Sequence, residues 1–468
     1  VLAIYGVGLL LSVSPNDIPR LEEVSVDGRV LAFTLTASVL TGIVFGLAPA
    51  LQASKLDLNK TLKEGSRSGT SSSTRQRMRS LLAVSEVGLA MVLLIGAGLL
   101  IKSFVRLVSV DPGFDPQNVL TLEMALPQSS YPKPSDWTVF YQQILERIET
   151  LPGVRSASMV SNIPMDRSAP EAPFSIQGRP YDPTGKPPVV RFQMAGQNYF
   201  RTMGIPVVRG RDFSKQDTSE TSRVVIINEA MAARFFFGDD PLGKYVKLGA
   251  PQAPAPWLVI AGVVKNVRSG GLEREVKPEM YLPFVERPRP SMTFVLRTQS
   301  DPASMAAAVR NEVQALDKNQ PIHNVRTMGQ VVNASVAQRR FSMFLLAVLA
   351  AIALTLSTVG LFGVMAYSVG SRTQEIGIRM ALGAQHRDVI KMVVGQGLKL
   401  TLIGVGVGLA AASVLTRFLA SMLYEVGATD LTTFAGISLL LIAVALLACY
   451  IPARRATKVD PLVALRYE

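Results

Sequence analysis

The sequence predicts an α-helical membrane protein that carries a separate α+β domain outside the membrane. Three observations lead to this fold class. The 468 residues combine 48% hydrophobic with 18% charged side chains at a mean hydropathy of +0.29, which is too apolar for an ordinary soluble enzyme and too charged for membrane spans alone. Several apolar runs have the length of membrane spans, and the long block at residues 107–337 has the mixed pattern of a globular domain.

Five apolar runs have the length of complete spans, since about 20 helical residues cross a hydrocarbon layer about 30 Å thick. They are residues 31–50, 80–102, 342–367, 398–421 and 431–453. A further run, residues 1–13, has no basic leader before it and no cleavage-like site after it, so we interpret it as a partial span and not as a signal peptide. We therefore expect the chain to be a fragment that lacks its native N-terminus.

A nine-residue ending occurs twice, as PALQASKLD at residues 49–57 and as PARRATKVD at residues 452–460. The two copies share several identities at one constant offset, 452 − 49 = 403. At the same offset Asp27 corresponds to Asp430, and each aspartate precedes an apolar run whose helix it is expected to cap. The repeat predicts that a structural unit is duplicated within the chain.

Lysine and arginine gather in the segment 55–79, in the loop 371–391 and in the tail after residue 453. Cytoplasmic loops carry such an excess, and alternation from them places residues 107–337 on the other side of the membrane. The net charge of +13 is thereby explained as membrane orientation, which disfavours nucleic acid as a partner and makes membrane lipid the expected surroundings. Residues 65–79, rich in Gly, Ser and Thr, are predicted to be a flexible linker.

The block outside the membrane is expected to have two lobes, one α/β and one mostly β. A helix is predicted after Ser135 as N-cap, and a second helix begins at Asp301 and Pro302. Each helix has strand-like runs on both sides, and short apolar runs between these two units predict a strand-rich insertion.

Motifs that would carry catalysis or bind a cofactor are not found. The run GDDPLGK at residues 238–244 has the spacing of a phosphate-binding loop, but Tyr245 replaces the required Ser or Thr and two aspartates would repel phosphate, so a turn is predicted. His323 and His386 are predicted to lie on opposite sides of the membrane, and Cys449 is the single cysteine. We therefore expect no catalytic, cofactor or metal site and no enzymatic activity.

The cytoplasmic loop SRTQEIGIRMALGAQHRDVIKMV resembles the loop between the second and third spans of MacB/FtsX-type permeases of ABC transporters. The resemblance continues through LYEVGATDLTTFA and IPARRATKVDPLVALRYE, and the block outside the membrane resembles the family's periplasmic core domain through DPLGKYV, VIAGVVKNVR and MYLPF. The duplication is most similar to the orphan permease subgroup with two four-span units, and the resemblance implies a bacterial inner-membrane location.

The resemblance implies a domain organisation. Residues 1–65 would end a first FtsX-like unit, and residues 66–79 would link it to a second. The second unit would consist of a first span at 80–106, the periplasmic core domain at 107–337 and an FtsX-like domain at 338–468. Two such units imply a pseudo-dimer within one molecule, with a homodimer as the other possibility.

In the family, a short helix at the resembling loop docks into a separate cytoplasmic ABC ATPase. The residues to which the resemblance assigns this coupling are Arg372, Glu375, Ile376, Gly377, Arg379, Ala381, Gly383 and Ala384. Their pattern alone favours a different structure, because apolar residues alternate from Ile376 to Leu382 as they do in a strand. The other interpretation of the loop is an ordinary solvated basic segment.

Two features inside the predicted spans are candidates for interactions. Gly404 and Gly408 form a GxxxG pattern, which permits close helix packing, with or without a specific partner helix. Glu86 is an intramembrane carboxylate. One interpretation is that its side chain extends to the membrane edge or pairs with Arg79 there. The other is that it has a functional role.

The function implied by these observations is a permease subunit that couples ATP hydrolysis by a separate ATPase to a conformational change of a periplasmic domain, in efflux or mechanotransmission. The alternative is a membrane-anchored periplasmic binding or scaffold module without ATP coupling.

Overall fold

The computed structural model describes residues 27–54, 70–166, 169–181, 187–217 and 223–457. These form two compact units, one from the chain up to residue 106 together with residues 339–468, and one from residues 107–338. The predicted partial span at 1–13 and the ends of both copies of the repeat lie outside the described residues.

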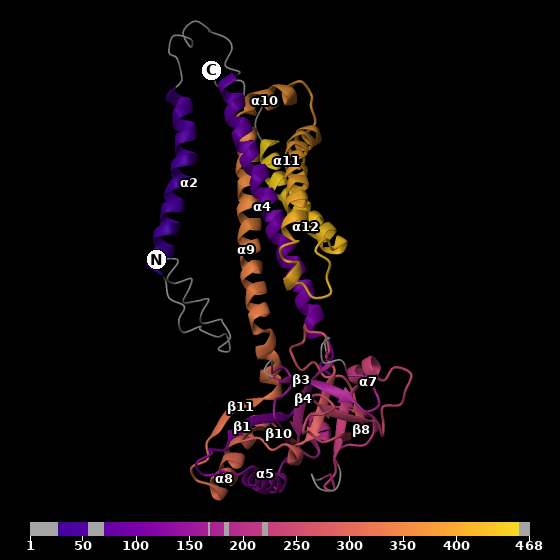
Figure 1. The fold of residues 1–468 in the computed structure, drawn as a ribbon. Helices are drawn as coiled ribbons and strands as arrows, with labels where there is room; N and C mark the ends of the chain where they lie inside the picture. The colour runs from indigo at the N-terminus through magenta and orange to yellow at the C-terminus, as the bar shows by residue number, and fades with distance from the viewer. Residues whose placement is uncertain (1–26, 55–69, 167–168, 182–186, 218–222, 458–468) are drawn as a thin grey trace. The chain divides into compact units, whose positions relative to one another are not determined.

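The first unit is built from helices. They are α2 (Gly28–Ser54), α4 (Thr70–Val108), α9 (Met328–Gly370), α10 (Thr373–Ala381), α11 (His386–Leu415), the 3₁₀ turn η4 (Ala420–Met422) and α12 (Leu431–Ala456). The predicted span 31–50 lies within α2, whose described apolar stretch, Gly28–Leu40, is shorter than a span. Among the described residues, α4, α9, α11 and α12 are long and apolar enough to cross a membrane, and they match the other four predicted complete spans. They run alongside one another, and α10 lies across one end (Figure 1).

Helix boundaries differ from those of the predicted spans in two instructive places. Helix α4 begins at Thr70, so residues 70–79 are helical and not part of the predicted linker; a helix nucleated by an apolar span extends outward at little cost. Helix α11 ends at Leu415 and not at residue 421. Beyond Val414 the backbone amides of Arg417 and Phe418 bond three residues back, which tightens the chain and ends the α-helix.

Residues 107–338 form the α+β domain. Its strands are β1 (Val119–Ala125), β2 (Val154–Val160), β3 (Glu171–Ile176), β4 (Val189–Ala195), β5 (Val207–Gly210), β6 (Val224–Asn228), β7 (Tyr245–Leu248), β8 (Leu258–Val264), β9 (Glu279–Pro283), β10 (Ser291–Thr298) and β11 (Ile322–Thr327). Its helices are α5 (Pro134–Glu149), α6 (Tyr199–Met203), α7 (Glu229–Phe235), α8 (Ala306–Leu316) and the turns η2 (Phe284–Glu286) and η3 (Pro302–Met305).

Four strands form the sheet of the first lobe, in the order β11-β1-β10-β2 with all neighbours antiparallel. Helices α5 and α8 lie together against this sheet (Figure 1). Helix α5 begins with Pro134 after Lys133 as N-cap, and Asp136 accepts a hydrogen bond from the Lys133 amide at 3.1 Å. The prediction of Ser135 as the cap was therefore wrong, because Pro134 already takes the first helical position.

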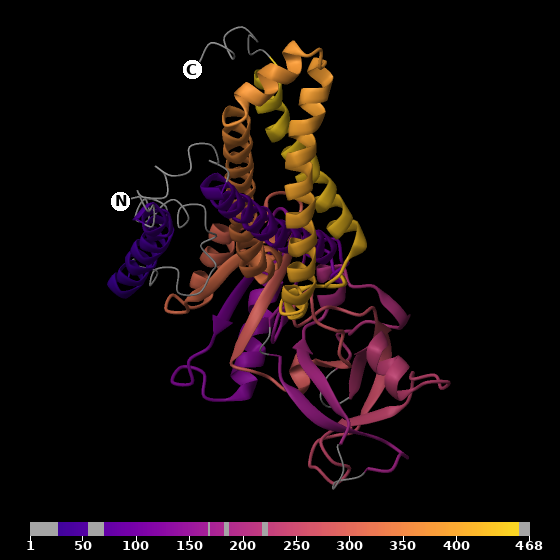
Figure 2. The same cartoon turned by 90° about the horizontal axis from the view of Figure 1, so that it is seen from above.

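The second lobe is a ring of six strands. Neighbours pair in the order β4-β3-β7-β8-β6-β9, and β9 pairs in parallel with β4, which closes the ring. Figure 2 shows the strands of this domain from a second direction. The strand ladders of the two lobes meet at Val160 of β2 and Ala195 of β4. Closure leaves the ring without free edges, apart from the added strand β5 on β8.

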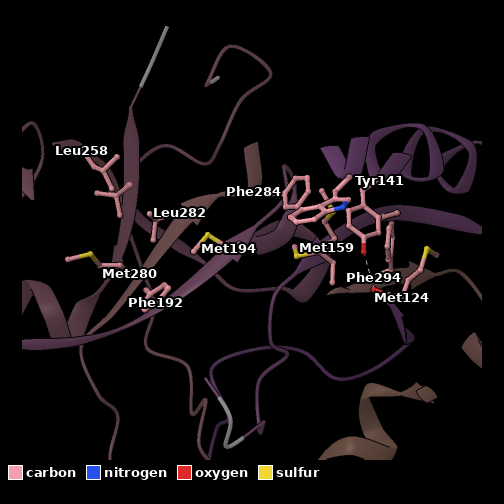
Figure 3. Close-up of a cluster of buried hydrophobic side chains, with 14 of the residues drawn as sticks. Met124, Tyr141, Met159, Phe192, Met194, Leu258, Met280, Leu282, Phe284 and Phe294 are labelled. Atoms are coloured by element: carbon pink, nitrogen blue, oxygen red, sulfur yellow. Dashed lines mark hydrogen bonds between the residues drawn. The ribbon is translucent and has the colours of Figure 1, made fainter. Parts of the chain in front are cut away.

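One hydrophobic core runs through both lobes (Figure 3). At the junction Tyr141 of α5 packs edge to face on Phe294 of the first lobe and on Phe284, whose ring centroid is 5.7 Å away. The Tyr141 hydroxyl donates to the carbonyl oxygens of Met124 and Pro290, so its polar end is satisfied although the side chain is fully buried.

Candidate functional site

The segment that resembles the coupling loop folds as helix α10. The strand predicted from its alternating pattern is therefore not formed, and that prediction was wrong. Ile376 is only 2% exposed because it packs with Val389 of α11 and Val369 of α9, and Gly377 beside it is also buried. A short segment of nine residues is marginal as a helix by itself. Its contacts with two neighbouring helices therefore stabilise it.

Two further candidate residues, Gly383 and Ala384, form the C-terminal cap of α10. Gly383 has φ +95°, in the left-handed region that favours glycine. Its amide donates to the carbonyl of Met380, and the amide of Ala384 donates to the carbonyl of Arg379. These two bonds make a Schellman motif, which satisfies carbonyls at the helix end and turns the chain sharply. Arg372 is the N-cap residue at the other end.

The outer face of α10 combines charges with apolar side chains. Glu375 and Arg379 form an ion pair of 2.7 Å between Oε1 and Nη2, and each side chain is 48% exposed. Ile378 is 42% and Leu382 82% exposed. The outer face of α10 therefore exposes charged and apolar side chains together, on a helix whose inner face packs against α9 and α11. The side chain of Ala381 lies outside the described residues.

Gly404 and Gly408 lie against helix α4. A methyl group added at Gly404 would stand 2.7 Å from Cβ of Val87, and one added at Gly408 would stand 2.6 Å from Cβ of Met91 and 2.9 Å from the carbonyl oxygen of Gly88. The pattern thus has a specific partner helix, which approaches closely because neither glycine has a side chain.

Glu86 does not pair with Arg79. The Arg79 guanidinium lies 3.8 Å from the ring centroid of Tyr367, where a cation–π contact holds it. The Glu86 carboxylate instead points at α9, where Oε2 is buried against Gly360 without a hydrogen-bond partner among the described residues. Gly360 has no room for a side chain because this oxygen occupies the space.

A buried carboxylate in the second lobe was not singled out in the sequence. Glu279 of β9 is 1% exposed and accepts hydrogen bonds from Ser269 at 2.8 Å, Tyr281 at 3.2 Å and Gln193 at 3.3 Å. Burial raises the pKa of Glu279 above its ordinary value, against these donors and nearby Arg191. The strand EMYLP gave no sign of this role, because Glu279 precedes the apolar residues and looks like a strand end.

In the described part of the chain, no group of three or more His, Cys, Asp or Glu side chains lies close enough together to hold a metal ion. The GDDPLGK run is a turn with positive φ at Gly238 and Gly243, as predicted.

The fold and the site together define a multi-pass membrane permease with a large extramembrane α+β domain. Two family models match the chain, the MacB-like periplasmic core domain over residues 80–312 and the FtsX-like permease C-terminal domain over residues 347–461. The chain belongs to the MacB/FtsX-type ABC permeases, and residues 107–338 are its periplasmic domain.

Relatives include the macrolide export ATP-binding/permease protein MacB of Azoarcus sp. (strain BH72), 28% identical over 285 residues that cover 58% of this chain and 42% of the relative. The pyoverdine export ATP-binding/permease protein PvdT of Pseudomonas putida is 25% identical over 294 residues, which cover 59% of this chain and 43% of the relative. The chain thus spans less than half the length of these relatives. The periplasmic region of MacB from Actinobacillus actinomycetemcomitans is 12% identical, with a TM-score of 0.33 and coverage of 48% of this chain and 95% of that one.

Proposed function

We propose that this permease couples ATP hydrolysis by a separate cytoplasmic ABC ATPase to a conformational change of its periplasmic domain, and that the change serves export. The observation that carries the proposal is α10. Its inner face packs on α9 and α11, while its outer face presents Glu375, Arg379 and Leu382. A push on this outer face would reach both long helices directly, because packed side chains transmit displacement.

We also propose that residues 1–65 are the end of a first FtsX-like unit, that residues 66–69 with the start of α4 connect it to the second, and that the two units pair as a pseudo-dimer. Asp27 supports the duplication. Its side chain accepts a hydrogen bond from the Arg29 amide at the start of α2, as the side chain of Asp430 does from the Thr433 amide at the start of α12. Both capping roles agree with the sequence prediction, at the offset of the repeat.

A crosslinking experiment tests the coupling. Cys449 is replaced by Ser, and Leu382 or Arg379 is replaced by Cys in the full-length protein, which is then crosslinked in native membranes and analysed by mass spectrometry. We expect an adduct with an ABC ATPase from Leu382→Cys, since this side chain is the more exposed. Gly406→Cys, on an exposed face of α11 within the membrane, is the control.

Repeated absence of the adduct, while a small thiol reagent labels the same cysteine, would contradict the coupling. That outcome would favour the alternative function, a membrane-anchored periplasmic binding or scaffold module.

A further inference from the structure

The connection between α11 and α12 is held by side chains of the neighbouring long helices. We call residues 422–430 the strap. Its middle, Val426, is 8% exposed and packs into the hydrophobic cluster that contains Leu99 of α4 and Leu441 of α12. Glu425, just before it, has φ +50°, an unfavourable conformation for a residue with a side chain. Such a conformation persists only where surrounding contacts impose it.

Three residues near the C-terminal end of α4 supply these contacts. Ser103 Oγ accepts a hydrogen bond from the Tyr424 amide at 2.7 Å, and Arg106 donates to the carbonyl of Glu425. Lys102 Nζ lies 2.7 and 2.8 Å from the two carboxylate oxygens of Asp430. From α9, Arg339 donates to the carbonyl of Met422 at 3.3 Å.

Asp430 joins two functions in one carboxylate. Its Oδ2 accepts from the Thr433 amide at 3.0 Å and so caps α12, while the same group forms the ion pair with Lys102. Lys102 also donates to Thr432 Oγ1 at 2.6 Å. The pair is only partly exposed, 30% for the Lys102 side chain and 18% for Asp430, and the Lys102 hydrogen bond is the main cause that holds the pKa of Asp430 below its ordinary value.

Asp27 offers a comparison within the same chain. It caps α2 through the Arg29 amide, but the position after the cap that corresponds to Thr432 is Arg29 itself. No ion pair of Asp27 is found in the part of the chain that the structure describes. Among the described contacts, Asp430 therefore combines its capping bond with an ion pair to Lys102 of α4.

We propose that the Lys102–Asp430 pair locks the strap to α4, so that α4, α11 and α12 move as one rigid body at their periplasmic ends. A displacement that enters α11 would then reach α4, which continues into the chain leading to β1. The role in transmission rests on the proposed coupling at α10, whereas the rigidity of the strap does not. Lys102 and Asp430 are positioning residues in this scheme.

Hydrogen exchange of the full-length protein in lipid nanodiscs tests the lock without any ATPase. Asp430→Asn keeps a good capping side chain but loses the charge, and Lys102→Met loses the partner. We expect strap amides in both variants to exchange about fivefold faster, the effect of a partly buried ion pair. The double variant should exchange no faster than either single one, because one interaction is lost only once. Asp27→Asn is the control and should leave the strap unchanged.

A second readout measures movement between the helices. Spin labels are placed at Val105→Cys of α4 and Val414→Cys of α11, both exposed, in a Cys449→Ser background. The distance distribution should be narrow with the native pair and with Lys102→Arg, and broader with Lys102→Met.

Unchanged exchange and an unchanged distance distribution in both single variants would overturn the lock. Loosening by Asp430→Asn alone, with Lys102→Met like the native protein, would also overturn it, because the charge of Asp430 would then stabilise the strap through a group other than Lys102. Failure of the crosslink at Leu382 with a positive result here would remove the ATPase coupling and leave the lock standing.

Discussion

Three glycines of α11 show how closely a residue's role depends on the face on which it lies. Gly404 and Gly408 face α4 at distances that exclude a side chain, whereas a methyl group at Gly406 would meet no atom within 4 Å. All three lie in the same apolar stretch of sequence. Helical spacing predicts that Gly404 and Gly408, four residues apart, share a face, but only the structure shows that this face meets another helix.

Gly408→Ala should therefore destabilise the helix bundle, while Gly406→Ala should not. The added methyl of Gly408→Ala displaces Met91 or the Gly88 backbone, and such overpacking costs about 1–3 kcal/mol. Cys449 is the single cysteine and is 1% exposed, so its labelling by a thiol reagent during heating measures opening of the bundle. Earlier labelling of Gly408→Ala than of Gly406→Ala is expected, and equal labelling would mean that the contact with α4 is absent.

The buried carboxyl group of Glu279 should make the stability of the periplasmic domain depend on pH. Its pKa is raised by burial, so the folded protein binds this proton more tightly than the unfolded chain, and the free energy of unfolding falls as pH rises from about 4.5 through the raised folded pKa. Glu279→Gln keeps the shape without titrating. Its melting temperature relative to the native protein should increase with pH across this window.

Trp137 and Trp257 are the two tryptophans, and both lie in the periplasmic domain. Their fluorescence therefore reports the melting of this domain in the full-length protein. A difference between Glu279→Gln and the native protein that does not vary with pH would show that Glu279 keeps one protonation state throughout.

At the scale of elements, α10 is decided by packing and not by local pattern. The alternation from Ile376 to Leu382 places apolar residues on both faces of the helix, so Ile376 is buried while Ile378 and Leu382 are exposed. The exposed pair Glu375–Arg379 adds little stability, since i,i+4 ion pairs contribute about 0.3–0.5 kcal/mol. The buried isoleucine contributes more.

Ile376→Ala should detach α10, with a cost of about 2–5 kcal/mol for a buried isoleucine. The matched control is Ile378→Ala, which removes the same atoms from a side chain that is 42% exposed. Trypsin cleavage after Arg379 measures the difference, because a protease needs locally unfolded chain. Cleavage should accelerate in Ile376→Ala alone, and similar rates in the two variants would contradict the packing of this helix.

At the scale of the whole chain, the two lobes of the periplasmic domain share little strand pairing. Aromatic contacts between the lobes join them instead. The ladders meet at one residue pair, Val160 and Ala195, whereas Phe284 and Tyr141 pack ring against ring in a common core. Rigidity of the domain therefore depends on side-chain packing across the junction.

Phe284→Ala should destabilise the domain by about 3–5 kcal/mol, as expected for a phenylalanine that is 2% exposed. Phe237→Ala is the control, since that ring is 92% exposed and its loss should change stability by less than about 0.5 kcal/mol. Tryptophan fluorescence during thermal unfolding compares the two. A small effect of Phe284→Ala would show that the lobes are held together elsewhere.

Helices α4, α9, α11 and α12, the capping by Asp27 and Asp430, and the strands β1, β2, β10 and β11 that flank the two predicted helices could be predicted from the sequence, because hydropathy, charge and capping act over a few residues. The boundaries at Thr70 and Leu415 could not, since hydropathy does not mark where helical hydrogen bonding starts or stops. Of the candidate site, the resemblance supplied the residues of α10. It did not supply which of them face outward, because that depends on Val369 and Val389, which contact the helix from other elements.

The sequence by itself determined that the chain is a membrane permease with a periplasmic domain, through its apolar runs, its basic loops and its family motifs. Only the tertiary structure decided that β9 closes a ring with β4, that Glu86 faces Gly360 and that Lys102 meets Asp430. Each of these contacts joins residues far apart in the chain, 328 positions in the last case. Local properties of a sequence specify elements, but contacts between distant side chains exist only after those elements have packed.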